Sequence, residues 1–240
     1  MKSRAALPPR AAAAAALVAV LAMSPAAAAP PQRVTLRYDV SQNGITMVEA
    51  TETLEHDGRT YRIQAEWQGK GLFALSARGK ARRSSEGDIS ANGLAPRQFR
   101  DQRGDGPLGV ARFEWARKVL VREREGRTES QSLPEQAQDR LSFAYGFAFA
   151  SPPGGEISAF IADTRGMSRH RYAVAGRETL KTSAGEFESL KLVKQRDPGD
   201  ERATEIWLAV KRNYLPIRVL VIEKDGTRLD QIITKIEPSQ

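Results

Sequence analysis

The chain has 240 residues, of which 37 are basic and 29 acidic, and it contains no cysteine. The lack of cysteine excludes disulfides, thiolate metal ligands, cysteine nucleophiles and a lipid-modified cysteine. The length suits a single domain that buries roughly 70% of its unfolded surface, so disulfides are not needed. We therefore expect an ordinary hydrophobic core to hold the fold together.

The first 28 residues have the three-part pattern of a Sec-type signal peptide. Three basic residues lie in the first ten positions, an apolar stretch follows over 11–23, and small residues come next. The stretch of roughly 13 residues is shorter than the ~20 needed to span a bilayer. We expect cleavage after Ala28, leaving a soluble periplasmic domain over 29–240 with no integral membrane segment and no lipid anchor.

The route of export and the remaining charge limit the partners. The two arginines of the signal segment are separated, so there is no twin-arginine signal and the chain should cross the membrane unfolded, without a cofactor loaded in the cytoplasm. Removal of the segment leaves 34 basic against 29 acidic residues. A mildly basic envelope protein meets anionic lipids and polymers, so we expect no nucleic-acid partner.

Beyond residue 31 the sequence consists of short alternating segments separated by turn residues such as Asn43-Gly44 and Asp225-Gly226. Apolar and polar residues alternate as in strands with one buried face. This pattern predicts a mainly β chain: a single curved antiparallel sheet or open half-barrel of about ten to twelve strands. The expected strands are 34–40, 45–54, 61–67, 77–84, 110–115, 119–123, 157–162, 169–174, 187–194, 204–209, 217–223 and 228–236.

Two segments depart from this pattern. Residues 100–108 are rich in Gly, Asp and Arg and predict a polar loop. Residues 141–150 are apolar, and their alternation also fits a strand. We favour one short helix near 140–150, because Asp139 stands in a capping position and Pro152-Pro153 follows. Asp139 and Ser142 are then a helix cap or, alternatively, a polar site.

Several short motifs resemble the bacterial periplasmic domain-of-unknown-function family 3108 over about residues 34–236. The motifs are Tyr38-Asp39-Val40 with Gly44, Gly93-Leu94-Ala95-Pro96, Gln138-Asp139-Arg140-Leu141-Ser142, Trp207-Leu208-Ala209 and Leu215-Pro216-Ile217-Arg218. The resemblance implies a β-rich envelope protein with no established activity and a helix after Gln138-Asp139. The tail is also similar to the outer-membrane lipoprotein carrier superfamily, whose half-barrel surrounds a hydrophobic cavity lidded by helix.

No motif points to catalysis, a metal or a cofactor. The two histidines, His56 and His170, stand apart in sequence and are expected to be exposed, and neither has the partners that a zinc site or a serine hydrolase requires. Phosphate-binding glycine loops are absent. We therefore expect no enzyme; a hydrolase with two carboxylates is the one chemistry that the sequence leaves open.

Large aromatic residues are the candidates for contact with a ligand; the alternative is that the same residues form the core. They are Trp67, Phe73, Phe143, Phe147 and Trp207. The basic run of Arg78, Lys80, Arg82 and Arg83 is expected to lie on an exposed strand face, where it could meet anionic lipid. The leading hypothesis is a non-enzymatic periplasmic protein that binds a hydrophobic or amphipathic envelope molecule. The alternative is an envelope scaffold whose strand edges pair with a protein partner.

Overall fold

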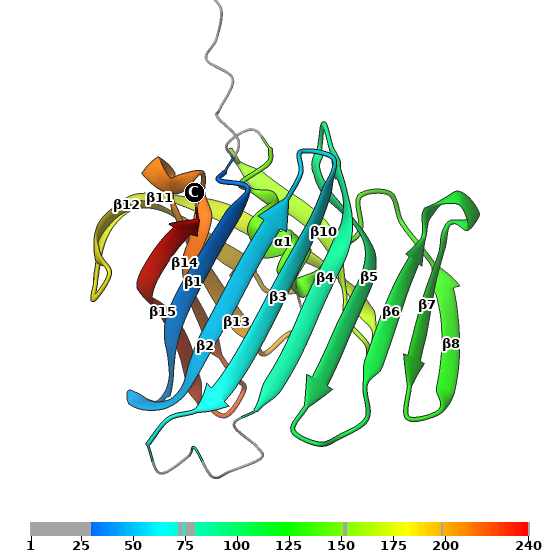
Figure 1. The fold of residues 1–240 in the computed structure, drawn as a ribbon, viewed down its shortest axis with the longest axis horizontal. Helices are drawn as coiled ribbons and strands as arrows, with labels where there is room; N and C mark the ends of the chain where they lie inside the picture. The colour runs from blue at the N-terminus through cyan, green and yellow to red at the C-terminus, as the bar shows by residue number, and fades with distance from the viewer. Residues whose placement is uncertain (1–29, 72–73, 75–79, 151–152, 198, 240) are drawn as a thin grey trace, which may run out of the picture.

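The computed structural model describes residues 30–71, 74, 80–150, 153–197 and 199–239. The expected signal peptide and Phe73 lie outside these ranges. Within them, fifteen strands form one continuous sheet, and a single α-helix, α1 (Arg140–Gly146), lies beside it (Figure 1). The predicted mainly β fold with one short helix near 140–150 is confirmed.

The sheet has two halves that meet where β1 pairs with β15. Its strands run in the order β8-β7-β6-β5-β4-β3-β2-β1-β15-β14-β13-β12-β11-β10-β9, so β8 and β9 are its edges. All of these pairings are antiparallel except that of β9 with β10. The first half comprises β1 (Arg33–Gln42), β2 (Ile45–His56), β3 (Thr60–Gly69), β4 (Ala81–Ser90), β5 (Gly93–Arg103), β6 (Gly109–Glu114), β7 (Val119–Arg124) and β8 (Arg127–Ser132). The second half comprises β9 (Gln138–Asp139), β10 (Glu156–Ala162), β11 (Met167–Thr182), β12 (Gly185–Gln195), β13 (Ala203–Ala209), β14 (Leu215–Ile222) and β15 (Arg228–Ser239).

The hairpins form as the sequence predicts. In β1 every second side chain from Val34 to Val40 is buried, and the residues between them are partly exposed. The turn into β2 places Asn43 at φ 50° and Gly44 at φ 85°. Both angles are positive, which a two-residue turn between twisted antiparallel strands requires and which Asn-Gly adopts readily.

The sequence missed three strands, β5, β8 and β9, and the predicted loop at 100–108 is wrong over its first part. Residues 100–103 continue β5 and pair with β4. Their charged side chains are compatible with a strand because a cross-strand ion pair satisfies them: Arg83 Nε lies 3.0 Å from Asp101 Oδ1. Arg83 is consequently half-buried on the inner face, which corrects the expectation for this residue; Lys80 and Arg82 are exposed as expected, and Arg78 lies outside the described ranges.

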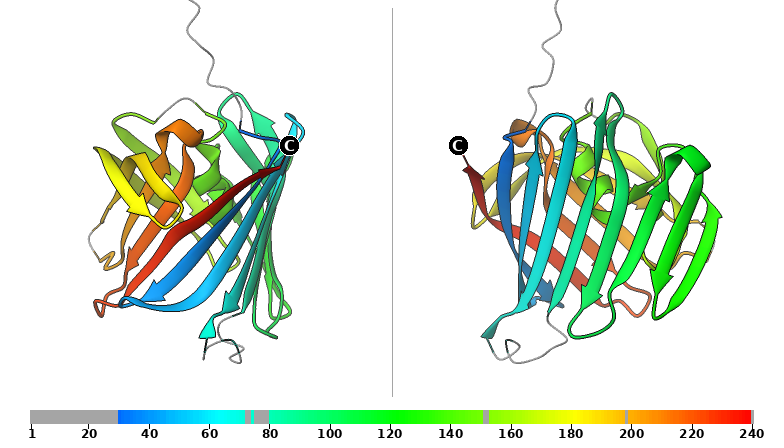
Figure 2. Two further views of the ribbon diagram at one scale, coloured as in Figure 1. Left: turned by 60° about the vertical axis from the view of Figure 1, so that its left-hand side comes forward. Right: turned by 45° about the vertical axis from the view of Figure 1, so that its right-hand side comes forward.

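The sheet curves so strongly that its two halves face each other with α1 between them (Figure 2). The loop between β10 and β11 reaches across to β6, where a Cβ on Gly109 would lie 2.8 Å from the Cβ of Thr164. Glycine is required at this position because the two segments approach too closely for a side chain. Two buried clusters result, one chiefly beneath β1–β7 and one between α1 and β10–β14.

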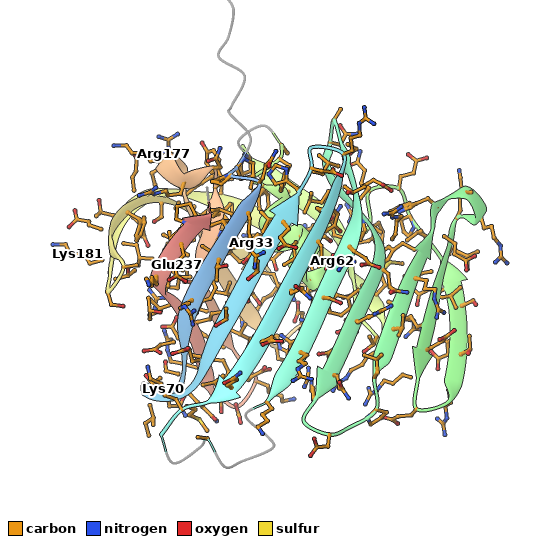
Figure 3. The ribbon with its side chains drawn as sticks, viewed as in Figure 1. Arg33, Arg62, Lys70, Arg177, Lys181 and Glu237 are labelled. Atoms are coloured by element: carbon orange, nitrogen blue, oxygen red, sulfur yellow. The ribbon has the colours of Figure 1, made fainter. Side chains whose placement is uncertain are left out.

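The outer face of the first half carries cross-strand ion pairs (Figure 3). Arg33 pairs with Glu55 at 2.7 Å, and Arg62 pairs with Glu86 at 3.2 Å. Exposed pairs of this kind contribute little, typically 0 to about 1 kcal/mol each. Their main effect is to keep the outer face of this half hydrophilic.

A buried carboxylate fixes the position of α1. Asp139 Oδ1 accepts hydrogen bonds from the backbone N–H groups of Leu141 (2.8 Å) and Ser142 (2.9 Å), and Ser142 Oγ accepts one from the Asp139 N–H (2.8 Å). This reciprocal arrangement is a capping box. Ser85 of β4 donates to Asp139 Oδ2 at 2.6 Å, so the cap also ties the helix to the sheet. The predicted cap is confirmed.

Burial raises the pKa of Asp139 to about 6. An unfolded aspartate titrates near 3.9, so between about pH 4 and 6 the folded chain binds more protons than the unfolded one, and stability falls as pH rises. Asp139→Asn keeps the acceptor for the helix N–H groups but cannot ionise. From pH 4 to 7 the wild type should lose about 2 kcal/mol of unfolding free energy more than this variant does.

Urea unfolding at the two pH values measures this difference. The exposed Asp105 supplies the control, because Asp105→Asn should follow the wild type at both pH values. Identical pH dependence in the wild type and Asp139→Asn would show that the buried cap does not titrate in this range.

Candidate functional site

An apolar cleft lies beside α1, on the inner face of the second half of the sheet. It has a volume of about 580 Å³, within the range of roughly 300–1,000 Å³ typical of small-molecule sites. Its lining consists of Arg140, Phe143, Ala144, Ile161, Ser168, Arg169, His170, Tyr172, Lys194, Asp197, Asp200, Arg202, Thr204, Ile206, Val219 and Val221. We refer to it as the α1 cleft.

Strand alternation brings the apolar part of this lining together. Ile206 pairs with Leu192 on one side and Val219 on the other, so these side chains share the inner face. Phe143 projects onto this face from α1, and its ring lies 5.1 Å from that of Tyr172. These side chains form an apolar floor, to which both α1 and strands distant from it in sequence contribute.

Charged groups surround one end of the cleft. Lys194, whose side chain is 7% exposed, places Nζ 2.5 Å from Asp200 Oδ2. The guanidinium of Arg140 bonds to Asp163, with Nη2 at 2.7 Å. Two further ion pairs, Arg202 with Glu223 at 2.8 Å and Arg171 with Asp197 at 2.5 Å, complete the charged end.

His170 lies inside this charged end and is half-buried, so the expectation of an exposed residue is wrong. Its Nε2 is 2.8 Å from the hydroxyl of Ser168. Burial lowers the pKa of His170 to about 4, with further lowering from the charges of Lys194 and Arg140. The imidazole is therefore neutral at neutral pH. His56 is also half-buried, with its ring edge-on to Phe149.

The aromatic residues singled out from the sequence do not form one site. Phe143 lines the α1 cleft, and Phe147 packs edge-to-face on it at 5.3 Å without lining the cleft. Trp67 lies in the first half of the sheet, where the guanidinium of Arg83 stands 4.9 Å from the centre of its ring. Phe73 lies outside the described residues.

Trp207 points away from the α1 cleft. Ile206 and Leu208, its neighbours in β13, pack with Phe143, so alternation directs Trp207 to the opposite face. Its ring is 2% exposed and sandwiched between Lys191 at 4.7 Å and Arg218 at 4.5 Å. Trp207 belongs to the larger buried apolar cluster, and the two cation–π contacts cover its indole, which gives it a structural position.

The two most deeply buried acids serve structure in this geometry. Glu52 accepts hydrogen bonds from the hydroxyl of Tyr145 (2.7 Å) and from Nε2 of Gln231 (3.0 Å), and burial raises its pKa. Asp139 is occupied by the helix cap. Neither carboxylate lines the α1 cleft, and in the described ranges no three His, Asp or Glu side chains gather closely enough to hold a metal ion.

The charged end of the α1 cleft was not predicted from the sequence. The signal for Lys194 was present, because Leu190, Leu192 and Lys194 alternate on one face of β12, and a lysine that continues an apolar face is unusual. Arg140 and Arg202 had no comparable signal. Their positions follow from the fold of α1 against the sheet and from the β12–β13 loop.

A strongly curved, largely antiparallel open sheet around one short helix defines the class: a β-rich protein with a half-open interior. The sequence profile of the family described as protein of unknown function DUF3108 matches residues 37–232. The chain therefore belongs to the DUF3108 family. No match was found among curated proteins, and no helix in the described ranges is long and apolar enough to cross a bilayer.

One solved structure shares the fold at low sequence identity, and another aligns more weakly. A β-barrel-like protein of the domain of unknown function DUF1849 from Brucella abortus aligns with a TM-score of 0.53 and 10% identity, covering 88% of this chain and 99% of that one. A candidate exported protein with a YmcC-like fold from Bacteroides fragilis aligns with a TM-score of 0.37 and 9% identity, covering 88% of this chain and all (100%) of that one. The first similarity supports the fold assignment alone.

The contribution of the Tyr145–Glu52 hydrogen bond to stability can be tested by removing the tyrosine hydroxyl. Tyr145→Phe leaves the buried Glu52 with one hydrogen-bond donor fewer, so the free energy of unfolding should fall by about 1–3 kcal/mol. The control is Tyr172→Phe, since this tyrosine is equally buried but lines the cleft; it should change stability by less than about 0.5 kcal/mol. Denaturant unfolding at pH 7 compares them. Equal effects would contradict a specific role for the Glu52 bond.

Proposed function

We propose that this protein binds an amphipathic molecule of the bacterial envelope in the α1 cleft and does so without catalysis, in the periplasm. The observation that carries the proposal is the composition of the cleft, which has an apolar floor of Phe143, Ile206 and Val219 and a charged end around Lys194. An amphiphile has the same two-part chemistry. The export pattern at the N-terminus supports the location.

The apolar floor is where binding energy would come from. Val219 and Val221 are partly exposed to the cleft although they lie on the inner face of the sheet. Covering such surface with an alkyl chain is favourable by about 25 cal/mol per Å² of apolar area removed from water. Phe143 is buried and fixed by the capped helix, so the floor is preformed and binding would not have to order it.

A scaffold role is the second candidate and has its own observation. β8 pairs only with β7, and its outer edge is free in the described structure (Figure 1). An extended segment of a partner could add to this edge. The six residues of β8 are polar and almost all exposed, a composition that protects natural edge strands against pairing. The cleft is therefore the better supported site.

A bulky residue in the cleft tests the proposal. Val221→Trp should fill the floor and weaken binding of the uncharged fluorescent probe N-phenyl-1-naphthylamine by about tenfold or more, since the apolar surface is lost to the ligand. Val121→Trp is the matched control, because this half-buried valine lies on β7, away from the cleft. Fluorescence titration measures both, and the control should bind like the wild type.

Mass spectrometry of lipids extracted from the periplasmic protein adds a second measurement. Wild-type protein and Val121→Trp should carry a bound amphiphile that Val221→Trp lacks. An empty wild-type protein that also fails to bind the probe would overturn the proposal. Retention of probe and lipid by Val221→Trp would place binding elsewhere.

A further inference from the structure

We propose that the amphiphile carries an anionic head group, a phosphate or a carboxylate, and that this group lies at the charged end of the α1 cleft against Arg140, Lys194 and Arg202. The inference rests on the proposed function and assigns the class of its ligand. An apolar cleft alone would accept any alkyl chain. The charges at its end discriminate between head groups.

Cations outnumber acids in the lining. The lining cations are Arg140, Arg169, Lys194 and Arg202, and the lining acids are Asp197 and Asp200. Three further charged side chains pair with these groups from positions that do not line the cleft: Asp163, Arg171 and Glu223. The lining and these three side chains together comprise five cations and four acids. The residues that line the cleft themselves carry a net positive charge.

The cations also retain hydrogen-bond donors. The ammonium of Lys194 has three donors, and Asp200 takes one of them. The guanidinium of Arg140 uses Nε and Nη2 for Asp163, whereas Arg202 uses Nε for Glu223. A guanidinium has five N–H groups, so each arginine can bond to a second anion without breaking its ion pair.

His170 reports the sign of the local potential. Burial is the largest cause that lowers its pKa; the charges of Lys194, Arg140 and Arg202 lower it further, whereas Asp200 raises it. The neutral imidazole therefore stands in a positive field beside the hydroxyl of Ser168, 2.8 Å away. While the two groups are bonded to each other, one of them at a time can donate a hydrogen bond to an anion without adding a charge of its own.

The register of the strands gives the path of the alkyl chain. Thr204 of β13 pairs with Val221 of β14, and two residues further along the same face Ile206 pairs with Val219. These four side chains line the cleft together with Phe143. A head group beside Arg202 would thus place its chain across Val221 and Val219 toward Phe143, so the charged end and the apolar floor of the cleft lie in the order that an amphiphile requires.

Amphiphiles that share a dodecyl chain and differ in head group test this inference. Dodecyl phosphate, dodecanoate, dodecyl maltoside and dodecyltrimethylammonium are titrated into the protein below their micelle concentrations by calorimetry. We expect the two anionic compounds to bind about tenfold or more tightly than the cationic one. The difference should shrink at high salt, because part of the charged end is exposed and screened.

Two charge-removing variants locate the effect. Arg202→Gln and Arg140→Gln should each lower affinity for the anionic compounds about five- to tenfold, with unchanged affinity for dodecyl maltoside and for the uncharged naphthylamine probe. Lys224→Gln is the control: this exposed lysine pairs with Glu201 outside the lining and should have no effect. Unchanged binding of the uncharged ligands also shows that the variants are folded.

The outcomes separate the two proposals. Equal binding of anionic and cationic compounds, with normal binding of the uncharged probe, would overturn the head-group inference and leave the proposed function intact. If neither the uncharged probe nor any dodecyl compound binds, the proposed function fails. A preference for dodecyl phosphate over dodecanoate, or the reverse, supports the inference and identifies which anion the natural ligand carries.

Discussion

The buried carboxylate of Asp139 is the interaction on which the geometry of the interior depends. It closes the capping box with Ser142 and accepts a hydrogen bond from Ser85 of β4 at 2.6 Å. The hydroxyl of Tyr61 on β3 extends this hydrogen-bond network and lies 2.9 Å from Ser85 Oγ. A helix of seven residues would be marginal in isolation, so this anchor and the packing of its buried face determine where α1 lies.

The position of α1 then determines two other features. Tyr145 bonds to Glu52 of β2 on one side of the helix, whereas Phe143 packs against β11–β13 on the other. The helix therefore links the two facing halves of the sheet. The α1 cleft is the part of the interior that this short helix leaves open, which explains why its floor is apolar.

The placement of charged and apolar side chains on the two faces of the sheet follows from strand alternation. Leu192 and Lys194 of β12 and Ile206 of β13 point to the inner face. Trp207, the residue after Ile206, points to the opposite face, where Lys191 and Arg218 contact its ring. The same alternation keeps ion pairs such as Arg33–Glu55 on the outer face. A one-residue shift in register would exchange these faces, so the pairing of β13 with its neighbours specifies the cleft as much as the core.

The sequence by itself determined the elements whose signals are local. Alternation predicted β1, Asn43-Gly44 predicted its hairpin, and Asp139 ahead of an apolar stretch predicted the capped helix. Residues 100–103 were wrongly assigned to a loop because their strand is stabilised by Arg83–Asp101, a contact between distant residues. Only the tertiary structure decided the site: it separated Trp207 from Phe143 and brought Arg140, Lys194 and Arg202 to one cleft, since these distances depend on how the whole sheet curves around α1.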